Sequence, residues 1–219
     1  RLAAEVPAFA AEAKANGVRT LFFHHLNPYL LVSKEPLTNL EALKGKKIRT
    51  WGSDMPRMAQ AQGMTPITLS LPEIYEGLGR GVIDAAPFSV DLVMAYKIFE
   101  VAKNISDVTL WLGPSWGVWI GEAAWQKLLP QHQKIMLEVS AEANQRDMEV
   151  TIAAEKIARD ELKNRGVKFH PFSEADRQKW KASLPDFFAE FIATQEKAGK
   201  GADAAKMISI WKEVLESVK

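Results

Sequence analysis

The sequence predicts an α/β protein with a mainly parallel β-sheet that is covered by helices on both faces. Up to residue 121, short apolar runs rich in branched and aromatic residues alternate with stretches of helical spacing, and this alternation is typical of βα units. Residues 131–165 contain neither proline nor glycine and keep helical spacing throughout. At 1.5 Å per residue they predict one helix of roughly 50 Å, which is longer than a small domain is wide.

The amino-terminal residues start in the middle of a helical pattern. Leu2, Val6, Phe9 and Ala13 follow helical spacing, and the sequence opens with neither an initiator methionine nor a signal peptide. We therefore expect that an upstream segment is missing from this sequence.

The strands are expected where apolar runs are short and bounded by turn residues. They occupy residues 18–25, 29–33, 46–50, 66–70, 82–86, 108–112, 117–121 and 167–172. A loop with one short helical turn is expected between the second and third of these strands.

The helices between the strands carry start and stop signals. One helix is expected to begin at Ser53 or Asp54 and to end at Gly63. Ser70 and Glu73 have the spacing of a capping box and open the next helix. Further helices are expected from Ser89 to about Val101, at 131–165, at about 174–196 and at 201–217.

The composition excludes several classes of function. The 28 basic and 27 acidic residues nearly cancel, so no charge excess indicates binding to nucleic acid or to an anionic membrane. The sequence has no cysteine, which excludes disulfides, thiolate metal sites and a cysteine nucleophile. No apolar run approaches the ~18 residues of a membrane span.

Familiar catalytic and cofactor motifs are absent from the sequence. The glycines of GLGRG (residues 77–81) close a helix instead of following a strand, so they indicate helix termination and not a phosphate loop. His24 and His25 are adjacent on an expected strand and should point to opposite faces, which is a poor start for a metal site. No carboxylate pair has a spacing typical of a hydrolase. We expect no catalytic residue, no metal and no cofactor.

Arg49 is the candidate binding residue that the pattern itself singles out. It ends the expected strand KKIRT and stands just before a helix start at Ser53 or Asp54. Ligands of parallel α/β sheets bind beyond the carboxyl ends of the strands, where a guanidinium offers a fork of donors that matches a carboxylate. The spacing alone fits equally well a surface arginine that pairs with an acid.

The region that contains Arg49 resembles a known family. From Leu40 to Lys103 the chain reads LEALKGKKIRTWGSDMPRMAQAQGMTPITLSLPEIYEGLGRGVIDAAPFSVDLVMAYKIFEVAK. Its linked L-K-G-x-K-I-R, G-x-x-P and G-V-x-D patterns resemble the signature of the periplasmic substrate-binding proteins of TRAP transporters, the DctP-like family. The segments SKEP and WQKLLPQHQ and the very long helix also fit, so the resemblance covers nearly the whole chain.

The resemblance implies a periplasmic-binding-protein-like fold. It has two α/β lobes joined by hinge strands, with a long helix spanning both, and the lobes close over the ligand. Family members carry an additional amino-terminal portion that completes the first lobe and is absent here. Residues 1–33 would form the remainder of the first lobe and a hinge strand, residues 34–112 the second lobe, and residues 113–219 the hinge return, the long helix and the carboxyl-terminal helices.

The resemblance also implies a binding site. The arginine at the position of Arg49 binds the carboxylate of an organic acid in that family. This chain has Pro87, Phe88 and Ser89 where many relatives have a polar residue, and Pro28–Tyr29 where some have a second arginine. We therefore expect a less polar site in which Ser89 donates a hydrogen bond. The residues expected to line it are Tyr29, Trp51, Phe88 and Trp116, each of which would serve equally well in a core.

The function implied is that of a non-catalytic solute-binding protein of the periplasm. Such a protein captures an organic acid and delivers it to a TRAP-type membrane permease, and we expect it to be a monomer that does not insert into the membrane. The ligand is expected to be a monocarboxylate with an apolar or aromatic body, in preference to a C4-dicarboxylate or a sugar acid. Two alternatives remain open: a two-lobed α/β enzyme acting on a small carboxylic acid, and a ligand-sensing or interaction module of the same fold.

Overall fold

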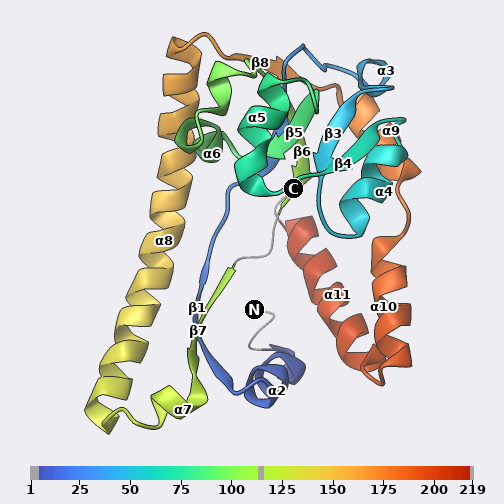
Figure 1. Cartoon of the computed structure of the whole chain (residues 1–219). Helices are drawn as coiled ribbons and strands as arrows, with labels where there is room; N and C mark the ends of the chain where they lie inside the picture. Colours follow the sequence, from blue (N-terminus) through green and yellow to red (C-terminus); the bar gives the residue numbers. More distant parts are fainter. Residues whose placement is uncertain (1–4, 113–115, 218–219) are drawn as a thin grey trace. The chain divides into compact units, whose positions relative to one another are not determined.

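The chain divides into two compact units. The computed structural model describes residues 5–112 and 116–217 (Figure 1). The first unit contains the described residues of 1–23, 117–144 and 186–219, and we call it the ribbon unit. The second contains the described residues of 24–116 and 145–185, and we call it the sheet unit.

The sheet unit is built on six strands in the order β4-β3-β5-β2-β6-β8. The strands are β2 (Tyr29–Ser33), β3 (Lys47–Thr50), β4 (Thr65–Thr68), β5 (Ala85–Phe88), β6 (Asn104–Trp111) and β8 (Lys168–Pro171). β3 runs parallel to β4 and β5, and β6 runs parallel to β8. β2 is antiparallel to both of its neighbours, β5 and β6. The sheet is therefore mixed, with mainly parallel pairs, as the alternation of strands and helices predicts.

The direction of β2 decides which residues meet at one edge. Because β2 is reversed, its first residue lies at the edge where β3, β5 and β6 end. Tyr29 accordingly lies opposite Trp111, the last residue of β6, and Leu30 lies opposite Phe88, the last residue of β5. This edge carries the residues discussed below.

Helices cover both faces of this sheet. On one face, Leu30 and Val32 belong to a core cluster with residues of α5 (Ile74–Gly79), α6 (Val90–Ala95) and the carboxyl-terminal part of α8. On the other, Leu31 belongs to a cluster with residues of α3 (Leu40–Leu43), α4 (Asp54–Gln60) and α9 (Glu174–Ser183). Alternation along a strand separates the two clusters. The prediction that both faces are covered is confirmed.

The ribbon unit contains a two-stranded sheet, several helices and the first part of α8. β1 (Val18–His24) pairs with β7 (Trp116–Gly121), and each strand has one terminal residue that falls in the sheet unit. The helices are α2 (Pro7–Ala15), α7 (Glu122–Trp125) and the neighbouring pair α10 (Phe187–Lys197) and α11 (Gly201–Ser217).

Helix α8 (Pro130–Asn164) is continuous over 35 residues (Figure 1). Its residues up to 144 belong to the ribbon unit and those from 145 onward to the sheet unit. The long helix expected at 131–165 is therefore confirmed. Within the described ranges, no helix is both long and apolar enough to cross a membrane.

Several expected elements differ from the structure, and one of them is the strand expected at 108–112, which spans Asn104–Trp111. The helix expected from Ser89 to Val101 ends at Ala95, because Lys97 adopts a left-handed conformation (φ 55°) and a short 3-10 turn, η2 (Ile98–Glu100), follows. The helix expected at 174–196 is interrupted between α9 and α10, where Pro185 cannot continue a helix.

The strand expected at 82–86 lies at 85–88 instead. Gly81 has a positive φ (73°), and the Asp84 side chain accepts a hydrogen bond from the Lys47 backbone, so the chain turns before the strand begins. Gly81 follows the end of α5, which confirms that GLGRG terminates a helix. Leu2, expected in the first helix, lies outside the described residues.

Candidate functional site

Arg49 is a buried arginine with no acidic partner in the described part of the chain. It lies on β3 and is only 7% exposed. Its Nε donates to the backbone oxygen of Leu69 at 3.1 Å, and its guanidinium carbon lies 4.1 Å from the centre of a Trp51 ring. These two contacts hold the side chain while the terminal nitrogens of the fork remain available. Burial lowers the pKa of Arg49, and the nearby Tyr29 partly opposes that shift.

Trp51, the stacking partner of this arginine, belongs to a group of four contacting rings, and we call Tyr29, Trp51, Phe88 and Trp111 the aromatic cluster. The Tyr29 ring centre lies 4.9 Å from that of Trp111, 6.0 Å from that of Trp51 and 6.1 Å from that of Phe88. Trp51 and Trp111 meet edge to face at 5.7 Å. These separations are those of favourable aromatic pairs. The expected residues Arg49, Tyr29, Trp51 and Phe88 are therefore brought together.

The local sequence explains why these rings converge. The cluster members at the ends of β5 and β6 meet the start of the reversed strand β2, as described above. Trp51 follows the end of β3, and Gly52 behind it has φ 62°, a left-handed conformation that glycine adopts at little cost. The chain can thus turn away immediately after Trp51.

The polar residues Asn27 and Asp91 lie beside the cluster. The buried amide of Asn27, two residues before Tyr29, donates to Asp91 Oδ1 at 3.1 Å and to the Thr151 backbone oxygen at 2.8 Å. Burial raises the pKa of the Tyr29 hydroxyl; the positive charge of Arg49 opposes this rise, and the negative charge of Asp91 adds to it. Tyr29 therefore stays protonated near neutral pH and can donate a hydrogen bond.

Ser89 and Trp116 were also expected in the site. Ser89 is buried (1% exposed) at the amino-terminal cap of α6, directly after Phe88, and its side chain makes no capping hydrogen bond. Trp116 is 65% exposed, and the described residues give it no ring contact. The structure thus places Ser89 next to a cluster member and leaves Trp116 apart. Both roles stay predictions.

Trp111, Tyr96 and Asp91 also lie at the site but were not expected there from the sequence. Trp111 lies within an expected strand, but only the pairing of β2 with β6 reveals that it faces Tyr29. Tyr96 meets Phe88 edge to face at 5.8 Å from just beyond the end of α6. The apolar spacing of the helix after Ser89 was visible, and it could have placed Asp91 in the first turn beside Phe88.

The two histidines do not point apart as expected. His24 Nδ1 and His25 Nδ1 lie 2.6 Å and 3.2 Å from the two carboxylate oxygens of Asp147, which also accepts a hydrogen bond from the His25 backbone at 2.7 Å. Strand alternation does not apply, because β1 ends at His24. Among the described residues, no group of three or more possible ligands could hold a metal ion.

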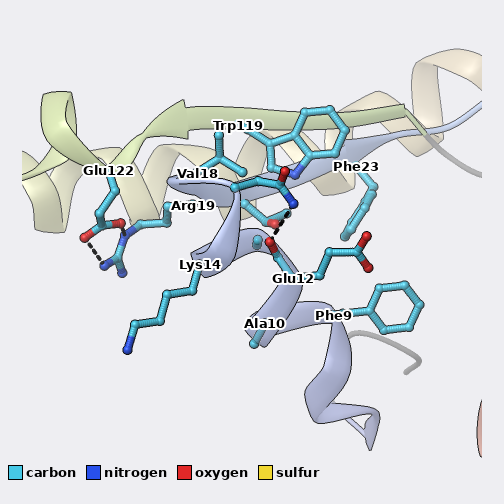
Figure 2. Close-up of a pocket in the computed structure, with 12 residues that line it drawn as sticks. Phe9, Ala10, Glu12, Lys14, Val18, Arg19, Phe23, Trp119 and Glu122 are labelled. Carbon is cyan, nitrogen blue, oxygen red and sulfur yellow. Dashed lines mark hydrogen bonds and ion pairs between the residues drawn. The ribbon is translucent and has the colours of Figure 1, made fainter. Parts of the chain in front are cut away.

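A separate hollow of about 930 Å³ lies in the ribbon unit. Figure 2 shows Phe9 of α2, Phe23 of β1 and Trp119 of β7 around it, with Arg19 and Glu122 paired beside it at 3.0 Å. No residue predicted for the binding site lines this hollow.

Comparisons with known proteins give one family. The model of the family described as bacterial extracellular solute-binding protein, family 7 (DctP), matches residues 5–195. The 2,3-diketo-L-gulonate-binding periplasmic protein YiaO of Escherichia coli is 28% identical over 177 residues, which cover 80% of this chain and 52% of that protein. The chain therefore spans about half the length of this relative.

Solved structures show the same fold. A TRAP periplasmic solute-binding protein from Chromohalobacter salexigens with bound D-glucuronate has a TM-score of 0.80 at 19% identity, covering 94% of this chain and 68% of that one. One from Actinobacillus succinogenes with bound L-galactonate has a TM-score of 0.69 at 28% identity, covering 82% and 59%. The predicted fold class, an α/β periplasmic-binding-protein-like chain, is confirmed.

Proposed function

The chain belongs to family 7 of the bacterial extracellular solute-binding proteins, and we propose from this that it serves as a periplasmic receptor for an organic acid. In this proposal the protein binds the acid without chemical change and delivers it to a TRAP-type permease. It acts as a monomer. Arg49 binds the carboxylate.

The state of Arg49 is the observation that supports this proposal most strongly. A buried charge is costly unless it is paired, and the described residues supply no acid to Arg49. A ligand carboxylate would provide the missing pair through two parallel charge-assisted hydrogen bonds. The contacts with Leu69 and Trp51 fix the side chain in advance, which reduces the entropy lost on binding.

The aromatic cluster supports a ligand with a single carboxylate and a flat body. Its rings favour apolar groups and the apolar faces of sugars, and they offer no second cation. The names of the relatives include the sugar acids 2,3-diketo-L-gulonate, D-glucuronate and L-galactonate, and each of these carries one carboxylate. We propose a monocarboxylate here too, and we retain the expectation that an apolar body is preferred to a sugar.

The test uses the full-length protein. Mass spectrometry of the small molecules released on denaturation should detect a monocarboxylic acid, and calorimetry with a panel of organic acids should give saturable binding at a ratio of one. Recovery of the acid unchanged after incubation is expected. Conversion of the acid would favour the enzyme, and a panel with no binding member would favour a sensing or interaction module.

A further inference from the structure

Asp91 is an acidic residue beside the aromatic cluster. The proposed binding of a carboxylate at Arg49 does not by itself require an acid at this position. It lies in the first turn of α6, three residues after Phe88, and is partly exposed. A carboxylate near an anion-binding site weakens the binding of anions, because like charges repel. The position of Asp91 therefore needs a reason.

Asn27 holds this carboxylate in place. Its amide nitrogen bridges Asp91 Oδ1 and the backbone oxygen of Thr151 on α8, and Asn27 is itself buried. One side of the carboxylate is thus tied to the sheet unit. Asp91 Oδ2 makes no hydrogen bond or ion pair within residues 5–112 and 116–217, so it can accept one from another molecule.

Tyr29 is close enough to both Arg49 and Asp91 for both charges to act on the pKa of its hydroxyl. Its ring contacts Trp51, on which Arg49 is stacked, and it contacts Phe88, which leads into the turn that carries Asp91. Arg49 and Asp91 do not pair with each other in the described chain. One held cation and one held anion thus lie near the same tyrosine of the aromatic cluster.

We propose that Asp91 determines ligand specificity by accepting a hydrogen bond from a hydroxyl or N–H group at the far end of the bound monocarboxylate, and that it excludes dicarboxylates. This inference rests on the proposed carboxylate binding at Arg49. A hydroxyl or N–H group satisfies the available oxygen, whereas a second carboxylate would be brought close to Asp91 without a donor between them. The substrate class is therefore a hydroxy acid or an acid with an amide or ring N–H group.

The test compares ligand pairs that differ only at the far end. We suggest 4-hydroxybenzoate with terephthalate, and L-galactonate with galactarate, titrated into the full-length wild type, Asp91→Asn and Asp160→Asn. Asp160 is an exposed acid on α8 that lies 3.7 Å from Lys163, so its substitution controls for the loss of one negative charge. Asparagine at 91 keeps an acceptor for Asn27.

The wild type should bind the hydroxy member of a pair roughly tenfold or more tightly than the dicarboxylate. Asp91→Asn should reduce that ratio at least several-fold by improving dicarboxylate binding, and Asp160→Asn should leave it unchanged. An unchanged ratio in folded Asp91→Asn would overturn the inference while carboxylate binding stands. If that variant fails to fold, the wild type alone provides the test. Tighter binding of the dicarboxylates than of the hydroxy acids by the wild type would also overturn the inference. The absence of any acid binding would instead remove the proposed function, and the inference with it.

Discussion

Arg49 is restrained by contacts that leave its two terminal nitrogens available for the carboxylate proposed to bind there. Nε is used by the Leu69 carbonyl and one face of the guanidinium by Trp51. A lysine could make neither the stacking contact nor a planar two-donor contact with a carboxylate. At this scale, the proposed binding depends on one side chain, on Trp51 that stacks on it and on the rings that contact Trp51.

Substitution of Trp111 tests how much those rings contribute to stability and to acid binding. Replacing it with alanine removes edge-to-face contacts with Tyr29 and Trp51, and we expect the free energy of unfolding to fall by about 2–4 kcal/mol. Acid binding should weaken as well, because Trp51 loses a neighbour that holds it under Arg49. Chemical denaturation and calorimetry of the two proteins measure both effects.

Trp119→Ala is the matched control. Trp119 is 55% exposed on β7 and belongs to the ribbon unit, whereas Trp111 belongs to the sheet unit. Its removal should leave acid binding unchanged. Equal losses of affinity in the two variants would contradict a specific role for Trp111.

At the scale of elements, a polar stripe on α8 pairs with the chain that leads from β1 to β2. Asn144 accepts from the Phe23 backbone within the ribbon unit. In the sheet unit, Asp147 accepts from the His25 backbone and Thr151 from the Asn27 side chain. Positions 144, 147 and 151 share one face of a helix. The side chains of Asn144 and Asp147 thus accept from backbone N–H groups, and the backbone oxygen of Thr151 accepts from the Asn27 amide.

Asp147 is expected to make stability depend on pH. Burial would raise its pKa, but hydrogen bonds from the His25 backbone and from the rings of His24 and His25 outweigh burial and lower the pKa below the usual 3.8. A lowered folded-state pKa stabilises the protein above the unfolded value, and this contribution is lost as the pH falls through the folded value. Asp147→Asn should therefore cost about 1–3 kcal/mol at pH 7, and the difference from wild type should shrink below about pH 4.

Urea unfolding of both proteins between pH 3 and pH 7 measures this difference. Asp160→Asn on the same helix should show almost none, because its ion pair with Lys163 is exposed. A difference in unfolding free energy between wild type and Asp147→Asn that stays constant down to pH 3 would contradict the proposed pH dependence at Asp147.

Element types were predictable from sequence where local signals are strong. The capping box at Ser70 and Glu73 is present, and the uninterrupted spacing of 131–165 gives a single helix. The ends of elements were predicted wrongly where the backbone conformation of a single residue determines where a helix stops. The left-handed conformation of Lys97 ends a helical pattern that continues in the sequence, and Pro185 ends another.

The candidate site was predictable only in part. Arg49 follows from its place at a strand end, and Tyr29, Trp51 and Phe88 from the family resemblance. Trp111 could not be found in this way, because its ring neighbours Tyr29 and Trp51 are far away in sequence. Strand order and the reversed direction of β2 bring Trp111 to Tyr29, and neither property is encoded in a local pattern.

At the scale of the whole molecule, the grouped site residues all belong to one unit. Arg49, the aromatic cluster, Asn27 and Asp91 lie in the sheet unit. Recognition of the carboxylate is therefore expected to be a property of this unit. Because the chain spans about half the length of its E. coli relative, affinities should be measured on the full-length protein.

Calorimetric titration of Arg49 variants tests the central claim most directly. With the acid that is released from the purified full-length protein, Arg49→Ala should lose about 2–5 kcal/mol of binding free energy, and Arg49→Lys should also bind poorly because an ammonium cannot reproduce the fork. Arg80→Ala, which removes an exposed arginine paired with Glu76 at 3.0 Å, should bind like the wild type. Wild-type affinity in a folded Arg49→Ala protein would contradict the account.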